Sequence, residues 1–340
     1  MDGEAHSGEA TAAAGFLSML RCLGDGEARS GADLARQLGI GRAAVWKRVQ
    51  ALRARGVPVE GRTGLGYRLP WPVELLDAVQ IGAALPAAAR QRLGALRVLA
   101  EVDSTSSEAR RAALPDMGCV LAECQRAGRG RRGRGWLSPP GLNLYVSCVK
   151  RFESGMAALS GLSLAVGVML VQAVGDAGIE GVGLKWPNDL LGAPGSAAPG
   201  AKLGGILVEL DGEVGGPCSA VIGIGLNLRL PPALRQAAGQ AASDLAEFAG
   251  GQPPPRNRMA ARLIARLIDG LARFEQHGFA AFADEYARHD LLRDRPVRVQ
   301  MPREVLLGHG AGIDAGGALR LRTGDGVVVV DSAEVSVRGA

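Results

Sequence analysis

Apolar residues recur at helical spacing through the first part of the chain, and short extended runs follow them. Ser30 is placed to cap the second of the resulting helices, and Gly39 is placed to end it. Two apolar runs, 57–59 and 67–69, flank the glycine-containing turn 63–66 and predict a β-hairpin. The spacing predicts three helices, at about 16–23, 33–38 and 42–55. Helices, a short turn and a hairpin in this order are typical of a winged helix-turn-helix.

The third of these helices is basic on the side that its apolar residues leave outside. Arg42, Lys47 and Arg48 lie on this helix, and Arg62 lies on the hairpin. Positive side chains on a recognition helix and its wing are suited to contacts with phosphates and base edges. We therefore predict that these four residues bind DNA. A winged helix that contacts only protein, with its charges solvated, is the alternative.

Beyond Pro72 strand-like runs alternate with helical ones, which predicts an α/β domain. The strands are expected at 98–102, 120–123, 142–149, 183–185, 205–210 and 220–228, and two helices at 159–177 and 258–277. From 296 to 337, short β-rich runs separated by glycines predict a small barrel of the SH3 type. We thus expect a disordered N-terminus (1–15), a winged helix (16–72), a central domain (73–290) and a C-terminal domain (291–340).

The composition narrows the class of protein. Hydrophobic residues make up 47% of the chain and charged residues 21%, as in globular proteins. No apolar run approaches the roughly 18–20 residues that span a bilayer, and the acidic first residues do not resemble a secretory signal. The five scattered cysteines contain no C-x-x-C pair, which predicts reduced thiols in the cytoplasm. A net charge of +5 permits an anionic partner.

The most unusual segment is the arginine/glycine loop, 128–135, which reads GRGRRGRG and precedes Trp136. Glycine lets the backbone approach a ligand closely, and each arginine offers a fork of donors to a phosphate or carboxylate. Trp136 adds an aromatic face for a purine ring. We interpret the loop as a clamp for nucleotide phosphates. A plain solvated loop is one alternative, and an RNA tether is another, although RNA tethers repeat such clusters within long disordered tracts.

Further polar residues stand at the ends of predicted strands. Asn188 and Asp189 lie in a turn after one strand, and Lys202 opens another, where its charge needs an anionic partner. The hydroxyls of 104–106 either cap a helix or contact a ligand. The chain has no P-loop, no G-x-S-x-G elbow and no H-E-x-x-H motif. The chain thus offers groups that can donate hydrogen bonds to phosphates, but it shows no motif of a catalytic nucleophile. This combination predicts an enzyme that joins two bound substrates by positioning and charge neutralisation.

Taken together, these motifs resemble the family of bifunctional biotin–protein ligases and biotin-operon repressors, over nearly the whole chain. In the winged helix the matching segments are AAVWKRVQALRARGV and GLGYRLP. In the rest of the chain they are DST, QRAGRGRRGRGW, GLNLYVS, LKWPNDLL, KLGGILVEL, VIGIGLN, RPVRV and GIDAGGALRL. The resemblance implies a multidomain α/β protein whose central mixed-sheet ligase domain is like that of class II synthetases, with an SH3-like barrel after it.

The same resemblance implies a reaction and a set of partners. Biotin would be activated with ATP to biotinoyl-5′-AMP and then transferred to one lysine of the biotin carboxyl carrier protein of acetyl-CoA carboxylase. Mg²⁺ would arrive with ATP, held mainly by phosphate oxygens, so we expect no metal site made by the protein alone. The adenylate-bound chain would form a homodimer that binds operator DNA and represses transcription in response to biotin. No membrane partner is implied.

Matched residue by residue, the resemblance also implies roles. Lys202, Arg129 and Arg131 would be catalytic, because they stabilise the charge that develops as the anhydride forms. Biotin would be bound by Ser104, Thr105, Ser106, Gln125, Arg129, Gly130, Arg131 and Lys202. ATP and the adenylate would be bound by Arg129, Arg131, Arg132, Trp136, Asn188, Asp189 and Asn227.

Two departures from the family pattern accompany this likeness. Ser106 stands where the family often has asparagine, and the segment 192–200 is longer than the usual turn. Three other functions remain alternatives. A lipoate or octanoate ligase shares the catalytic architecture but attaches another acyl group. The second alternative is a repressor that senses biotin without catalysis. The third is a ligase whose winged helix no longer binds DNA.

Overall fold

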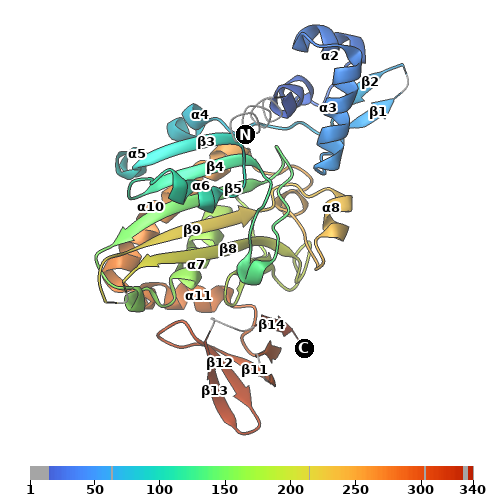
Figure 1. The fold of residues 1–340 in the computed structure, drawn as a ribbon. Coiled ribbons are helices and arrows are strands. Elements are labelled where there is room, and N and C mark those ends of the chain that lie inside the picture. The colour runs from blue at the N-terminus through green and yellow to red at the C-terminus, as the bar shows by residue number, and fades with distance from the viewer. Residues whose placement is uncertain (1–14, 63, 214, 302–303, 332–335, 340) are drawn as a thin grey trace.

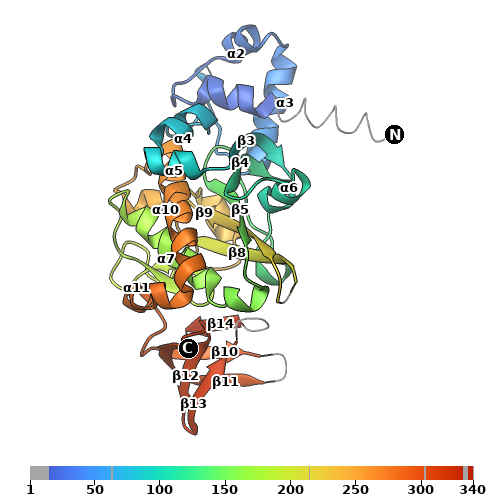
Figure 2. The ribbon, with the colours of Figure 1, turned by 90° about the vertical axis from the view of Figure 1, so that its left-hand side faces the viewer.

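The computed structural model describes residues 15–339 except for 63, 214, 302–303 and 332–335. The winged helix lies at one end of the molecule, the large sheet in the middle and a smaller sheet at the other end (Figures 1 and 2). The expectation of disorder over 1–15 lies outside the described residues, apart from residue 15, which is helical. Among the described residues, none of the helices has the length and apolar character needed to cross a membrane.

The N-terminal part has the predicted helices and wing. A helix over 15–23 precedes α2 (Gly31–Leu38), α3 (Arg42–Ala54) and the antiparallel strands β1 (Glu60–Arg62) and β2 (Gly66–Arg68). Ser30 caps α2 by accepting a hydrogen bond from the Asp33 amide at 3.1 Å, and Gly39 ends it in the left-handed conformation. The first wing strand starts later than predicted, because Val57 and Val59 are buried in the helical core and do not pair.

The winged helix contacts the central domain at the end of α3. Gly56 follows this helix and lies against Leu234, so closely that a Cβ on Gly56 would be 2.7 Å from the leucine methyl groups. Arg55 forms an ion pair with Glu101 at 3.2 Å, and Glu101 also pairs with Arg126 at 3.4 Å. Glu101 therefore links the end of the recognition helix to the segment that leads into the arginine/glycine loop.

The central domain is built on a mixed sheet of seven strands in the order β3-β4-β5-β9-β8-β7-β6. Only β3 and β4 are parallel, and the other neighbours are antiparallel. The strands are β3 (Ala95–Val102), β4 (Gly118–Gln125), β5 (Leu144–Phe152), β6 (Val182–Lys185), β7 (Asp189–Gly192), β8 (Lys202–Gly212) and β9 (Cys218–Leu226). All six predicted strands are present, and β7 is one that the sequence pattern did not predict.

The two faces of this sheet are covered differently. On one face α7 (Leu162–Gly175) and α10 (Arg256–His277) pack side by side and bury the main hydrophobic core (Figure 2). On the other face α6 (Thr105–Arg111) packs over a smaller cluster that includes Val120 and Val221. Alternate residues of β4 divide between the faces, since Leu121 belongs to the main core and Val120 to the cluster under α6.

Several shorter helices were not predicted. They are α4 (Ala78–Ala84), α5 (Ala87–Arg92), α8 (Pro232–Ala237), α9 (Leu245–Phe248) and α11 (Ala283–His289). Single turns are also present at Arg131–Gly133, Met156–Leu159 and Phe279–Phe282. None of these segments is long enough to give a clear helical period in the sequence.

The C-terminal part is an antiparallel sheet of five strands in the order β13-β12-β11-β10-β14. Its strands are β10 (Pro296–Gln300), β11 (Val305–Ile313), β12 (Leu319–Thr323), β13 (Gly326–Val330) and β14 (Ser336–Gly339). The short β-rich runs of the sequence lie at 297–300, 305–307, 319–321, 326–330 and 334–337, and each overlaps one of these strands, although 334–335 are not described by the structure. The indole of Trp186, on the central domain, donates a hydrogen bond to the Gly317 carbonyl at 3.0 Å and so ties the two domains together.

Candidate active site

A cavity of about 670 Å³ opens on the sheet face that α6 partly covers. Its walls come from the loop 128–135 with Trp136, the turn between β6 and β7, the glycine-rich parts of β8 and β9, and the segment after α8. The structure brings together nearly all of the predicted site residues here. They are Ser104, Thr105, Ser106, Gln125, Arg129, Gly130, Arg131, Arg132, Trp136, Asn188, Asp189 and Lys202.

The arginine/glycine loop is a tight hairpin. The Trp136 amide donates to the Gly128 carbonyl at 2.8 Å, and the Gly130 amide donates to the Arg134 carbonyl at 2.7 Å. Arg132 at the tip adopts a positive φ of 59°, which lets the chain reverse within few residues. The hairpin brings several arginine side chains to one edge of the cavity.

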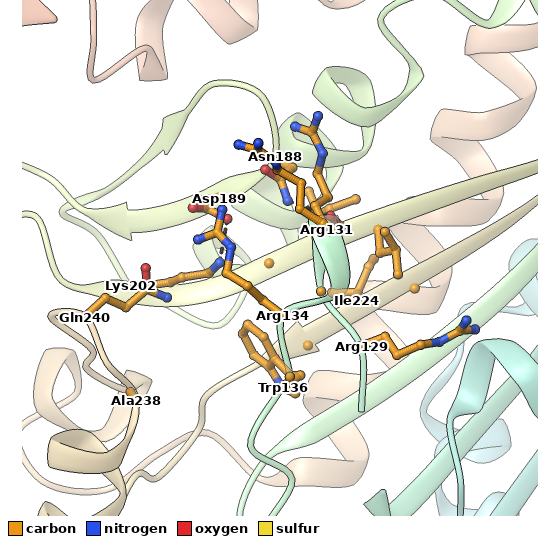
Figure 3. Close-up of a pocket in the computed structure, with 18 of the residues that line it drawn as sticks. Arg129, Arg131, Arg134, Trp136, Asn188, Asp189, Lys202, Ile224, Ala238 and Gln240 are labelled. Atoms are coloured by element: carbon orange, nitrogen blue, oxygen red, sulfur yellow. Dashed lines mark hydrogen bonds and ion pairs between the residues drawn. The ribbon is translucent and has the colours of Figure 1, made fainter. Parts of the chain in front are cut away.

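The arginines of this loop point in two directions. Arg131 and Arg134 lie on the side of Asn188 and Asp189, whereas Arg129 points the other way (Figure 3). Arg129 donates to the hydroxyl of Ser107 at 3.2 Å, on α6. Burial lowers the pKa of the Arg131 guanidinium, and the carboxylate of Asp189 opposes this shift. An anion bound beside Arg131 would replace the hydration that this side chain has lost.

Lys202 lies where β8 begins and is held between a carboxylate and an aromatic ring. Its Nζ is 2.6 Å from Oδ1 of Asp189 and 5.4 Å from the centre of the Trp136 ring (Figure 3). The lysine side chain is 15% exposed and that of the aspartate 19%, so the pair is partly withdrawn from water. In such surroundings a lysine acts more strongly on a nearby anion than it would in bulk solvent.

The ring of Trp136 lies in a shallow trough on β8 and β9. The trough is open because the residues beneath the ring are glycines. A Cβ on Gly225 would lie 2.3 Å from the indole, and one on Gly205 would lie 3.1 Å from it. The ring therefore rests directly on the backbone of β8 and β9. Its position is set by the absence of side chains beneath it as much as by the loop that carries it.

A chain of hydrogen-bonded hydroxyl groups begins at the cavity wall, where Thr105 and Ser106 lie, and extends to Ser147 behind it. The hydroxyl of Ser147 on β5 donates to the Thr105 hydroxyl at 2.8 Å, and it lies 3.0 Å from that of Ser106. Gln125 accepts from the Thr105 amide at 2.9 Å and donates to Ser138 at 3.0 Å. Neither Ser147 nor Ser138 was predicted, because an isolated serine in a strand or loop gives no signal of its own.

Ser104 stands at the N-cap position of α6 but makes no capping hydrogen bond. It is buried at the cavity wall, together with Thr105 and Ser106. Of the two interpretations that the sequence left open for these hydroxyls, helix cap or ligand contact, the geometry at Ser104 favours ligand contact.

Asn227 is the one predicted ligand of the adenylate that does not line the cavity. Its side-chain amide is buried and donates to the carbonyls of Ser243 at 3.0 Å and Lys202 at 3.4 Å. The residue thus lies behind Lys202 and links β8 to the chain after α8. Asn227 directly follows β9, which ends at Leu226, and its adenylate-binding role stays a prediction.

Some lining residues were missed. Lys185 lines the cavity, and so does the segment 238–241 after α8, labelled at Ala238 and Gln240 in Figure 3. Arg134, which the predicted clamp included without a role of its own, lines it as well. The Lys202 amide donates to the Ala241 carbonyl at 2.9 Å, which holds this segment beside the start of β8. Only the three-dimensional structure identifies this segment, since its two alanines, glycine and glutamine form no recognisable motif.

The predicted DNA-binding residues lie far from this cavity, on the winged helix. Arg42, Lys47 and Arg62 are exposed. Arg48 differs from them, because it is half-buried and donates a hydrogen bond to the Ser18 hydroxyl at 3.2 Å. Three of the four residues are therefore accessible to a partner, and the fourth braces α3 against the first helix.

Comparison with known proteins agrees with this architecture. The model of the biotin/lipoate A/B protein ligase family matches residues 98–227. An HTH domain model matches residues 17–68, and the model of the biotin protein ligase C-terminal domain matches residues 294–338. The matched regions follow the winged helix, the central domain and the C-terminal sheet along the chain.

Two similar proteins are the bifunctional ligase/repressors BirA of Salmonella typhimurium and Escherichia coli. The first is 39% identical over 95% of this chain and 98% of its own length, and the second is 38% identical over 95% and 97%. Among solved structures, the biotin protein ligase from Aquifex aeolicus in complex with biotin and ATP is 26% identical, with a TM-score of 0.61. It covers 72% of this chain and 99% of its own. The chain therefore belongs to the family of bifunctional biotin–protein ligases and repressors.

Proposed function

We propose that this protein activates biotin with ATP and transfers it to a lysine of the biotin carboxyl carrier protein of acetyl-CoA carboxylase. The observation that carries the proposal is one cavity in which Lys202, its partner Asp189 and the loop arginines surround a site beside an aromatic ring. This set can bind two anions, a carboxylate and a polyphosphate, close enough to react.

In the first step an oxygen of the biotin carboxylate attacks the α-phosphorus of ATP, and the bond to the departing pyrophosphate breaks. Lys202 lies between the carboxylate and the α-phosphate and stabilises the charge that accumulates there. Arg129 and Arg131 neutralise charge from the loop side, together with Arg132. Positioning and charge neutralisation are sufficient for this step because it needs no protein nucleophile.

The biotin ring is held against the cavity wall formed by residues 104–106 and Gln125. Ser104, Thr105, Ser106 and Gln125 offer hydroxyl and amide groups to its polar ring atoms, and Gly130 lets the loop approach. Trp136 stacks on adenine, while Asn188 and Asp189 face the adenylate. Asn227 acts indirectly, because its hydrogen bonds to the Ser243 and Lys202 carbonyls hold the backbone of the catalytic lysine.

In the second step the amine of the carrier lysine attacks the carbonyl carbon of biotinoyl-5′-AMP, and AMP leaves with the bonding electron pair. Mg²⁺ would enter with ATP and would be held mainly by phosphate oxygens, where it would neutralise part of their charge. Asp189 is a carboxylate at the cavity that could add a ligand, although it is paired with Lys202 here.

We further propose that the chain represses transcription as a homodimer whose formation the bound adenylate promotes. The exposed basic residues of α3 and the wing support binding to operator DNA. The protein would work in the cytoplasm, where its five buried thiols stay reduced. We also infer class II synthetase-like architecture for the central domain (73–290) and an SH3-like barrel for the C-terminal domain (291–340), after the winged helix (16–72).

The transfer reaction tests the enzymatic proposal. A purified carrier domain is incubated with the protein, ATP and either biotin, lipoate or octanoate, and its intact mass is measured. We expect one biotinyl group on one lysine and no lipoyl or octanoyl group. A carrier modified by lipoate or octanoate, or by none of the three acids, would contradict the proposal.

Operator binding tests the second function. DNA binding is measured across a concentration series of biotin with ATP, and we expect affinity to rise as the adenylate forms. Binding that is indifferent to biotin and ATP would refute the regulatory coupling and leave the ligase reaction untouched.

A further inference from the structure

Trp46 is a large aromatic residue that the winged helix leaves 55% exposed. An isolated apolar residue on a protein surface needs no explanation. Trp46, however, lies on α3, the recognition helix of the winged helix, and in the first half of that helix. In helix-turn-helix proteins this is the part of the recognition helix that contacts base edges.

The surroundings of Trp46 fit a duplex surface. Arg42, one helical turn earlier, and Lys47, the next residue, are both exposed, and neither forms an ion pair with any residue that the structure describes. Gly41 and Ala43 are also exposed and small, so they leave room beside the indole. The inner side of α3 is buried through Val45, Val49 and Leu52. On the exposed side, Trp46 lies between Arg42 and Lys47 around the helix, so it has a cation on either side.

The major groove supplies a matching apolar feature. Thymine presents its C5-methyl group there, and apolar side chains read this group by direct contact. Phosphates on either side of the groove accept the flanking cations. We propose that Trp46 is a specificity-determining residue of the DNA site, contacting a thymine methyl group in the major groove while Arg42 and Lys47 bind phosphates. This inference rests on the proposed DNA binding of the winged helix.

A second copy of the chain is the other occupant to consider for an exposed tryptophan. The helix α3 contains no acidic residue. Two copies that met through this face would bring Arg42 and Lys47 of each against like charges, which is unfavourable at close range. DNA satisfies the same cations with phosphate, so the charges favour DNA.

The first experiment separates base reading from charge. Duplexes are selected from a randomised pool by the full-length wild-type protein with biotin and ATP, and affinities are measured for the selected duplex and a scrambled one. We expect Trp46→Ala to weaken the selected duplex about tenfold or more and the scrambled one less than about twofold. The salt dependence of binding should stay unchanged. Trp46→Phe should fall between wild type and alanine.

Two further variants serve as controls for this experiment. Lys47→Ala should weaken both duplexes together and reduce the slope of log affinity against log salt by about one. Val79→Ala, which truncates an 80% exposed apolar residue on α4, should change neither duplex. Melting temperature checks the fold of each variant.

The second experiment removes the thymine methyl directly. Each thymine of the selected site is replaced in turn by deoxyuridine, which changes nothing else in the groove. We expect one position in each half-site at which wild type loses several-fold in affinity and Trp46→Ala loses nothing further. The uridine series on wild type alone still decides the matter if the alanine variant does not fold.

Several outcomes would overturn the inference. They are the absence of any uridine-sensitive position, an equal uridine effect in Trp46→Ala, and equal weakening of selected and scrambled duplexes. Loss of dimerisation in sedimentation with an unchanged affinity ratio would assign Trp46 to contact with a second copy. A wild-type protein that selects no sequence would refute the proposed DNA binding itself, and the role of Trp46 with it.

Discussion

Two arginine-rich regions of this protein present their charge in opposite ways. The arginines of the loop 128–135 stand at the edge of a cavity that contains Lys202. The basic residues of α3 are spread over the convex surface of a helix. A concave site concentrates positive charge on a small anion, whereas a helix surface offers it to an extended one. Surface shape therefore decides, together with charge, which polyanion each region suits.

Within each region the arginines also differ from one another. Arg129 bonds to Ser107, while Arg131 lies on the side of Asn188 in the cavity (Figure 3). On the winged helix Arg42 is exposed, while Arg48 bonds to Ser18. A side chain that points away from a cavity, or that braces one helix against another, has less to offer a ligand. The variants below test this distinction, in order of decreasing expected effect.

Replacing the cavity lysine should have the largest effect. We expect Lys202→Ala to slow formation of biotinoyl-5′-AMP by about a thousandfold, because a preorganised donor to the developing charge is lost. Lys202→Met keeps the apolar stem and should be as slow, which separates charge from packing. Single-turnover adenylation is the measurement, and a loss below about tenfold in both variants would contradict the assigned role.

The two loop arginines should differ. Arg131→Ala is expected to slow adenylation about a hundredfold, since Arg131 is the half-buried arginine on the Asp189 side. Arg129→Ala should slow it only about tenfold, because its guanidinium is shared with Ser107. Adenylation rates at saturating ATP and biotin measure this difference. Equal losses would mean that the direction of the side chain does not matter.

The trough beneath Trp136 can be filled without changing any charge. We expect Gly225→Ala to raise the KM for ATP about tenfold, because the new Cβ would lie 2.3 Å from the indole and displace it. Gly175→Ala is the matched control, since nothing lies within 4 Å of the Cβ it would add at the end of α7. An unchanged KM in Gly225→Ala would show that the position of Trp136 is not needed for nucleotide binding.

The recognition helix should show the smallest effects. Arg42→Ala is expected to weaken DNA binding several-fold and reduce the salt slope by about one. Arg48→Ala should instead lower the free energy of unfolding by about 1 kcal/mol, through loss of its bond to Ser18, with little change in the salt slope. Fluorescence titrations at several salt concentrations and denaturant melts distinguish the two. A lower salt slope in Arg48→Ala and a lower stability in Arg42→Ala would contradict this assignment, because Arg48 would then bind DNA and Arg42 would stabilise the fold.

Long elements with a clear period were predictable. The helix α10 was expected at 258–277 and is found at Arg256–His277, since its apolar stripe faces the sheet. The cavity was also largely predictable, because arginine, lysine and tryptophan at the ends of strands are chemically conspicuous. The glycines of the loop 128–135 indicated that the loop backbone can approach a ligand closely.

What the sequence did not reveal depends on partners distant in the chain. The strand β7 was interpreted as part of a turn, because its pairing with β6 and β8 exists only in the folded sheet. Ser147 and Ala241 carry no local signal and reach the site through their neighbours. Asn227 was assigned to the nucleotide by the family resemblance, and only the folded structure shows that its amide donates to the Ser243 and Lys202 carbonyls.

The central claim is that this cavity adenylates biotin. Biotin-dependent exchange of labelled pyrophosphate into ATP measures this step directly, beside lipoate and octanoate as competing acids. Wild type should exchange with biotin alone, and Lys202→Ala should lose the exchange. Absence of exchange with every acid, in a protein that still binds biotin, would contradict the account and leave a repressor that senses biotin without activating it.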